Sequence, residues 1–151
     1  MAVAESGPIA RLAATTGRLE RFVREHPELS TPFLVLDLEV VTDRYRQLRA
    51  ALPQASVLYA VKANPSRQVI RELKAAGSNF DVASPGEIDR CLGCGVDPAR
   101  LSYGSTIKKE RDVRYAYDCG VRVFAVDSEP ELDKIIRGAP GSTVFVRIKT
   151  D

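Results

Sequence analysis

Lysine, aspartate and arginine side chains stand at the ends of short apolar runs, where they could perform nucleophilic or acid–base chemistry. Lys62 directly follows the apolar run 57–61, and Asp81 lies near the end of a second run, 79–83. Loss of water around an amine favours its neutral form, which can attack a carbonyl carbon to give an imine. Lys62 is therefore a candidate carrier of a carbonyl compound, although a lysine that simply leaves a sheet for solvent would occupy the same position.

Two further polar residues lie at comparable points of the chain. Ser84 follows the run 79–83, and Arg147 lies one step inside the end of the run 144–148. A guanidinium buried in a strand needs an anionic partner, and Asp81 is a candidate for that partner. Asp81 could equally orient a ligand, so a functional pair and a structural ion pair both remain open.

The elements that must position these residues form a βα repeat. Helical patterns near residues 39–51, 66–76, 86–94, 108–118 and 129–138 alternate with apolar runs at 33–36, 57–61, 79–83, 101–103, 121–126 and 144–148. The run 57–61 is apolar on both alternating faces, which is typical of a covered strand in a parallel sheet. Residues 1–30 carry a looser helical pattern, and we interpret them as an N-terminal helical arm.

Helix starts can be read from side chains that cap the first turn. Ser84 with Glu87, and Ser128 with Glu131, each have the spacing of a capping box, in which hydroxyl and carboxylate bond the free backbone N–H groups. The capping role is enough to explain a glutamate at position 87, so Glu87 is not counted among the site residues. Pro65 after Asn64 predicts a third helix start with proline in its first position.

The fold class predicted from this pattern is α/β, as a partial (β/α)8 barrel. A dinucleotide-binding fold would place G-x-G-x-x-G after its first strand, but here that position reads K-A-N-P at residues 62–65. From residue 57 onward the pattern supplies about the first five βα units, whereas a closed barrel needs eight strands. We therefore expect residues 31–151 to be an incomplete barrel domain, and the sequence to be one piece of a larger enzyme.

Composition excludes several classes of function. The 22 basic and 20 acidic side chains nearly balance, which argues against a nucleic-acid partner. Lys108, Lys109 and Arg111 are interpreted as a solvated helix start. No apolar run approaches the roughly 18 residues of a membrane span, and a cytoplasmic protein is the default expectation. Cys91 and Cys94 are expected to be buried structural thiols, and no metal site is predicted.

Specific motifs resemble a known enzyme family. The segments Y-A-V-K-A-N at 59–64, F-D-V-A-S at 80–84, F-A-V-D-S at 124–128 and V-R-I at 146–148 are similar, in order and spacing, to fold-type III pyridoxal-phosphate decarboxylases of the alanine-racemase type. Residues 102–109 and 124–128 resemble the ornithine and lysine decarboxylase group. Many ornithine decarboxylases read A-N-P-x-K where this chain has Y-G-S-T-I-K at 103–108.

The resemblance implies a cofactor and a set of site residues. Pyridoxal 5′-phosphate would be held covalently by Lys62, and the cofactor site would be lined by Ala60. Asp81 would lie close to the cofactor ring and Lys62, and Arg147 would lie among the cofactor-site residues near Asp81. The family's stacking histidine, glycine-rich phosphate turn, pyridine-facing glutamate and C-terminal β-domain have no counterpart in this chain.

The implied reaction is decarboxylation of L-ornithine or L-lysine to a diamine by the complete enzyme, a homodimer, and the chain by itself is expected to be inactive. Diaminopimelate decarboxylase, or a non-catalytic homologue that acts as a regulatory partner, is the alternative.

Overall fold

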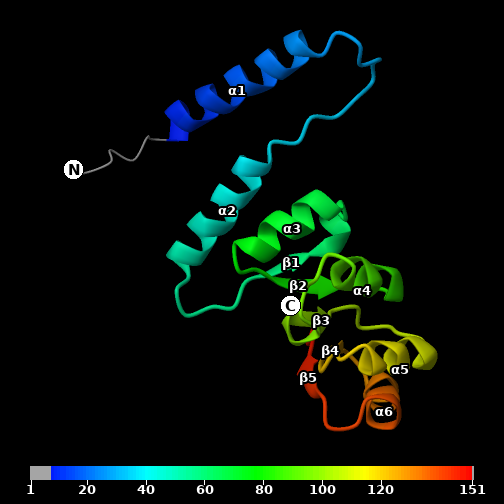
Figure 1. Ribbon diagram of the computed structural model, residues 1–151. Helices are drawn as coiled ribbons and strands as arrows, with labels where there is room; N and C mark the ends of the chain where they lie inside the picture. The colour runs from blue at the N-terminus through cyan, green and yellow to red at the C-terminus, as the bar shows by residue number, and fades with distance from the viewer. Residues whose placement is uncertain (1–7, 151) are drawn as a thin grey trace.

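The computed structural model describes residues 8–150, in which helices and strands alternate from residue 38 onward (Figure 1). Two helices come first, α1 (Pro8–Glu25) and α2 (Leu38–Ala51). The strands are β1 (Leu58–Ala60), β2 (Asn79–Val82), β3 (Leu101–Tyr103), β4 (Val123–Val126) and β5 (Thr143–Val146). The other helices are α3 (Arg67–Ala75), α4 (Pro85–Leu92), α5 (Glu110–Asp118) and α6 (Glu129–Gly138), with 3-10 turns η1 (Val61–Ala63) and η2 (Pro98–Arg100).

The five strands form one parallel sheet in the order β1-β2-β3-β4-β5. Helix α3 contacts α4, α4 contacts α5 and α5 contacts α6, so these helices lie side by side along the sheet (Figure 1). A doubly wound fold would reverse its strand order at a switch point and would cover both faces with helices. Sequential order with neighbouring helices is the arrangement of a (β/α)8 barrel, and it confirms the predicted fold class.

The two faces of the sheet carry different side chains because successive residues of a strand point to opposite sides. Phe80, Val82, Tyr103, Phe124 and Val126 are buried against the helices and form the centre of the core. The strand register places Ala60 beside Asp81 and Asp81 beside Ser102. These three residues alternate with the core residues, so they lie on the opposite face. We call that face of the sheet, defined by Ala60, Asp81 and Ser102, the open face.

One predicted strand is wrong. Residues 33–36 have no strand structure and form an irregular segment between α1 and α2. Leu34 in this segment is 88% exposed, and Leu36 is also exposed. A strand needs a neighbour to accept and donate its backbone hydrogen bonds, and no strand of the described residues pairs with this segment.

Helix caps follow the sequence at one predicted position and depart from it at two. The Ser84 hydroxyl accepts the Glu87 N–H at 3.3 Å, and the Glu87 carboxylate accepts the Ala83 N–H at 2.8 Å, much as predicted. Helix α3 begins two residues later than expected, because Ser66 rather than Asn64 is its N-cap. Ser128 is the N-cap of α6 but makes no capping bond with its side chain, so the second capping box is wrong.

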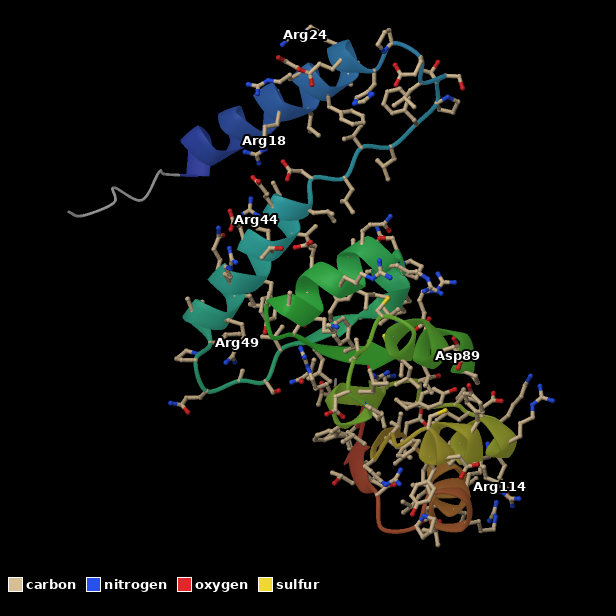
Figure 2. All side chains as sticks on the ribbon, viewed as in Figure 1. Arg18, Arg24, Arg44, Arg49, Asp89 and Arg114 are labelled. Carbon is tan, nitrogen blue, oxygen red and sulfur yellow. The ribbon has the colours of Figure 1, made fainter. Side chains whose placement is uncertain are left out.

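Charged side chains cover the outside of the helices. Figure 2 shows Asp89 on α4 and Arg114 on α5 at the outer side of the helices, away from the strands. Arg18 of α1 reaches the start of α2, where its Nη2 lies 2.7 Å from the N-cap carboxylate of Asp37 (Figure 2). None of the helices described for residues 8–150 has the length and apolarity needed to span a membrane.

Candidate active site

Strand register brings the predicted site residues to one end of the sheet. Ala60 ends β1 beside Asp81 of β2, and Lys62 follows two residues later in turn η1. Arg147 lies one residue beyond β5, and its backbone N–H donates to Val126 O at 2.7 Å, which continues the pairing with β4. All four residues therefore lie at the carboxyl ends of parallel strands, the end at which barrel enzymes carry their active sites.

Lys62 is held by a short turn, and its side chain faces solvent. Val61 before it is fully buried and anchors the turn in the core. On the far side, the Tyr59 hydroxyl donates to Asn64 O at 3.1 Å, and the Asn64 side chain accepts the Ser66 N–H at 3.0 Å. Lys62 itself is exposed, so the expected loss of water around its amine is wrong for this structure. The strand ends at residue 60, and turn η1 carries the amine out of the sheet.

Asp81 is half-buried on the open face and is electrostatically linked to both cations. Burial is the largest influence and raises the pKa of its carboxyl group above the ordinary value of 3.8. The charges of Lys62 and Arg147, and the nearby Gly104 backbone, each oppose that rise, whereas Glu87 adds to it. The pKa of the Asp81 carboxyl group is therefore influenced by Lys62 and Arg147, the two cations predicted from the sequence to lie near it.

Arg147 contacts the turn after β3 and does not pair directly with Asp81. Its Nη2 donates to Gly104 O at 3.4 Å, and the side chain is exposed. The expectation of a buried guanidinium with a carboxylate partner is therefore wrong in its geometry. Since β5 is an edge strand of the described sheet, no further strand covers Arg147. Its attraction for Asp81 acts at longer range.

Lys108 is a buried lysine whose environment was missed from the sequence. Its side chain is almost fully buried, and Nζ donates to the carbonyl oxygens of Ser105 at 2.9 Å, Thr106 at 3.2 Å and Ala125 at 2.6 Å. Burial lowers the pKa of this amine, and the neighbouring Glu131 opposes that shift. The interpretation of Lys108 as part of a solvated helix start is wrong. The lysine that ends the A-N-P-x-K motif of many ornithine decarboxylases corresponds to Lys108, and it was the sequence signal that could have set this residue apart.

Glu131 completes the same buried cluster from α6. Its Oε2 accepts the Lys108 backbone N–H at 3.1 Å, and its Oε1 lies 2.6 Å from Lys134 Nζ. Lys134 also donates to Lys108 O at 2.8 Å. Glu131 is therefore used to hold the loop after β3, and this use explains why it does not cap its own helix together with Ser128.

The cysteines behave as structural residues. Cys91 and Cys94 are buried, and Cys119 is partly buried; all three are free thiols. Burial raises the pKa of Cys91 to about 12, so this thiol is protonated near neutral pH and is a poor nucleophile. The prediction of buried structural thiols at residues 91 and 94 is confirmed.

An apolar cavity is separate from this polar cluster. It has a volume of about 640 Å³ and lies between α2 and β1, with Val41, Tyr45 and Tyr59 among its mostly apolar walls. Ala60 and Ala63 border it, but Lys62, Asp81 and Arg147 do not. Its walls offer few polar groups for chemistry, so the candidate site remains the cluster at the strand ends.

Comparison with known proteins gives consistent matches. Residues 38–151 match the family described as pyridoxal-dependent decarboxylase, pyridoxal binding domain. The lysine/ornithine decarboxylase of Selenomonas ruminantium is 42% identical over 120 residues, which are 80% of this chain and 30% of that protein. The ornithine decarboxylase of Schizosaccharomyces pombe is 41% identical over 132 residues, or 85% of this chain and 30% of the relative.

Solved structures agree with the sequence matches. Lysine/ornithine decarboxylase of Vibrio vulnificus, complexed with cadaverine, superposes with a TM-score of 0.82 at 32% identity, over 88% of this chain and 36% of that chain. Lysine decarboxylase of Selenomonas ruminantium gives a TM-score of 0.79 at 40% identity, over 83% of this chain and 33% of that chain. The chain thus spans about a third of the length of the proteins it matches.

Proposed function

Because this chain belongs to the pyridoxal-dependent decarboxylase family and carries its pyridoxal-binding domain, we propose that it is the cofactor-binding part of an enzyme that decarboxylates L-ornithine or L-lysine to a diamine. The main support is the convergence of Lys62, Asp81 and Arg147 at the carboxyl ends of β1, β2 and β5. Relatives named for lysine, ornithine and arginine favour a basic amino acid over diaminopimelate.

The residues present fit the aldehyde end of pyridoxal phosphate. An aldehyde requires a primary amine that it can reach, and Lys62 offers one that is exposed and held by a short turn. Ala60 at the end of β1 has only a methyl side chain, so it takes little space on the open face. When bound, the cofactor supplies an electron sink for the electrons released at the substrate's α-carbon as carbon dioxide leaves.

The proposed roles follow from the positions of the side chains. Lys62 would hold the cofactor through Nζ, and the same amine would be placed to return a proton to the substrate's α-carbon. Asp81 places a carboxyl group near Lys62 and balances its positive charge. Arg147 holds the turn after β3 through Gly104 O and adds a second positive charge near Asp81.

Assembly and location are part of the same proposal. We expect a homodimer in the complete enzyme, as the family resemblance implies, and a small-molecule amino acid as the substrate. Phe145 and Val146 of β5 are 60% and 66% exposed, which supports coverage of this edge by further protein. A cytoplasmic location is proposed from the lack of long apolar runs in the sequence.

The decisive test is covalent trapping of the cofactor. The purified chain would be incubated with pyridoxal phosphate, reduced with borohydride and digested, so that the labelled peptide can be identified. We expect label on the Lys62 peptide in the wild type and its loss in Lys62→Ala. Lys109→Ala is the matched control, because Lys109 is an exposed lysine away from the site. Label spread over many lysines in a folded sample would contradict the assignment.

Substrate choice needs a second assay. Release of carbon dioxide from ornithine, lysine, arginine and diaminopimelate would be measured with the chain supplemented by a C-terminal segment from a family member. Turnover of ornithine or lysine is the expected result. Specific labelling of Lys62 without turnover of any of these substrates would favour a non-catalytic homologue that binds a regulatory partner.

A further inference from the structure

Gly104 is tightly enclosed by a single side chain, that of Asp81. A Cβ atom added at Gly104 would lie 1.9 Å from Asp81 Oδ1, 2.6 Å from Cγ and 2.7 Å from Oδ2. The whole carboxyl group therefore rests against the α-carbon of this glycine. Gly104 does not have a left-handed backbone conformation, so its φ angle does not require glycine. A Cβ at this position would instead meet the Asp81 carboxyl group where it now lies.

Strand geometry explains why the carboxyl group lies there. Asp81 pairs in register with Ser102 of β3, and Gly104 follows two residues later on the same side of the chain. The Gly104 backbone N–H donates to Val82 O at 2.9 Å, which fixes the turn against β2 beside the Asp81 carboxyl group. The carbonyl oxygen of Gly104 accepts a hydrogen bond from Arg147 Nη2 at 3.4 Å. One residue without a side chain thus contacts both Asp81 and Arg147.

We propose that Gly104 is a positioning residue, which admits the Asp81 carboxyl group to the turn after β3 and thereby sets its position relative to Lys62. The effect of Gly104 on Lys62 as the cofactor-carrying amine rests on the proposed function. The steric argument about Gly104 and Asp81 does not. Gly104 also lies in the stretch 103–108, where this chain departs from the common ornithine decarboxylase motif.

Replacement of Gly104 by alanine is a mild and specific perturbation. Contacts to a Cβ shorter than 3.0 Å are essentially never seen, so the nearest carboxyl oxygen would have to move by about 1 Å or more. Asp81 can make that movement by rotation about its own side-chain bonds. The fold should therefore persist while the carboxyl group leaves its place beside Gly104.

The first experiment is carried out on the cofactor-free chain. NMR couplings would give the Asp81 side-chain rotamer in wild type, Gly104→Ala and Gly17→Ala. Gly17 is the matched control, because it lies in α1 and a Cβ there would meet nothing within 4 Å. We expect a changed rotamer in Gly104→Ala only. An unchanged Asp81 rotamer in a folded Gly104→Ala variant would overturn the proposal, whether or not the cofactor binds.

The second experiment asks whether Gly104 acts through Asp81. The pyridoxal phosphate concentration that half-saturates borohydride labelling of Lys62 would be compared in Gly104→Ala, Asp81→Ala and the double variant. We expect about a tenfold rise in Gly104→Ala and no additional rise when Asp81→Ala is already present, because the clashing carboxyl group is gone. An undiminished effect of Gly104→Ala in the Asp81→Ala background would refute the positioning role.

The two experiments separate this inference from the proposed function. If wild-type Lys62 takes no label, the proposed function fails, and the rotamer measurement still decides the role of Gly104. If Lys62 is labelled but Gly104→Ala leaves its half-saturation unchanged, the inference fails and the proposed function stands.

Discussion

Replacement of Lys108 by methionine should strongly destabilise the fold although the residue makes no direct contact with the candidate site. The variant removes a buried ammonium group and keeps an unbranched side chain of similar length. Three carbonyl oxygens, those of Ser105, Thr106 and Ala125, lose their donor. A hydrogen bond to a charged group contributes about 1.5–3 kcal/mol, while burial of the charge costs several kcal/mol in the wild type. We expect a net loss of about 3 kcal/mol in the free energy of unfolding.

The measurement is denaturant unfolding followed by circular dichroism, with Lys109→Met as the control. Lys109 is the next residue along the chain and is exposed, so the same substitution there should change stability by less than about 0.5 kcal/mol. The contrast between adjacent lysines isolates the buried cluster from any general effect of lost charge. A Lys108→Met variant as stable as the Lys109→Met control would refute the reasoning.

Two further predictions concern pH and helix capping. Because burial raises the pKa of Asp81 in the folded state, its contribution to stability is fully present below pH 3.8 and is lost as pH rises through the raised pKa. The stability of wild type relative to Asp81→Asn should therefore fall as pH rises from below 3.8 towards neutral, as measured by unfolding at a series of pH values; a difference independent of pH would contradict this. Ser84→Ala should cost about 1 kcal/mol because its hydroxyl caps α4, whereas Ser128→Ala, which removes no capping bond, should cost little. Equal losses in the two serine variants, measured by denaturant unfolding, would count against the capping assignment.

The order of elements could be predicted because the βα pattern is local. Each strand from β1 to β5 lies in a short, largely apolar run, and the helices that follow β1 to β4 present a spaced apolar face, so both signals can be read within a few residues. The apolar run 33–36 has the same signal but lacks a partner strand. Periodicity describes which side chains avoid water, and it does not say whether a neighbour is present to share backbone hydrogen bonds.

The sequence predicts that Lys62, Asp81 and Arg147 come together, but it predicts their surroundings less well. Lys62, Asp81 and Arg147 do converge, because the carboxyl ends of parallel strands meet at one edge of the sheet. The burial of Lys62 and Arg147 was overestimated, since the turn after β1 and the position of β5 at the sheet edge both expose them. Ser128 and Glu131 have the spacing of a capping box, but the Glu131 carboxylate instead accepts the backbone N–H of Lys108 from a loop distant in the sequence. Competition between local and distant partners cannot be read from spacing.

The loop from Gly104 to Lys108 links the stability of the fold to the geometry of the site. At one end Lys108 is bonded to the end of β4 and, through Glu131, to α6. At the other end the Gly104 backbone contacts Asp81 and Arg147. Only three residues separate Gly104 from Lys108. A displacement of Lys108 should therefore also move Gly104. Release of the buried lysine should therefore alter the surroundings of Asp81 as well as the unfolding free energy, and the Asp81 rotamer in Lys108→Met is the observation that tests this link.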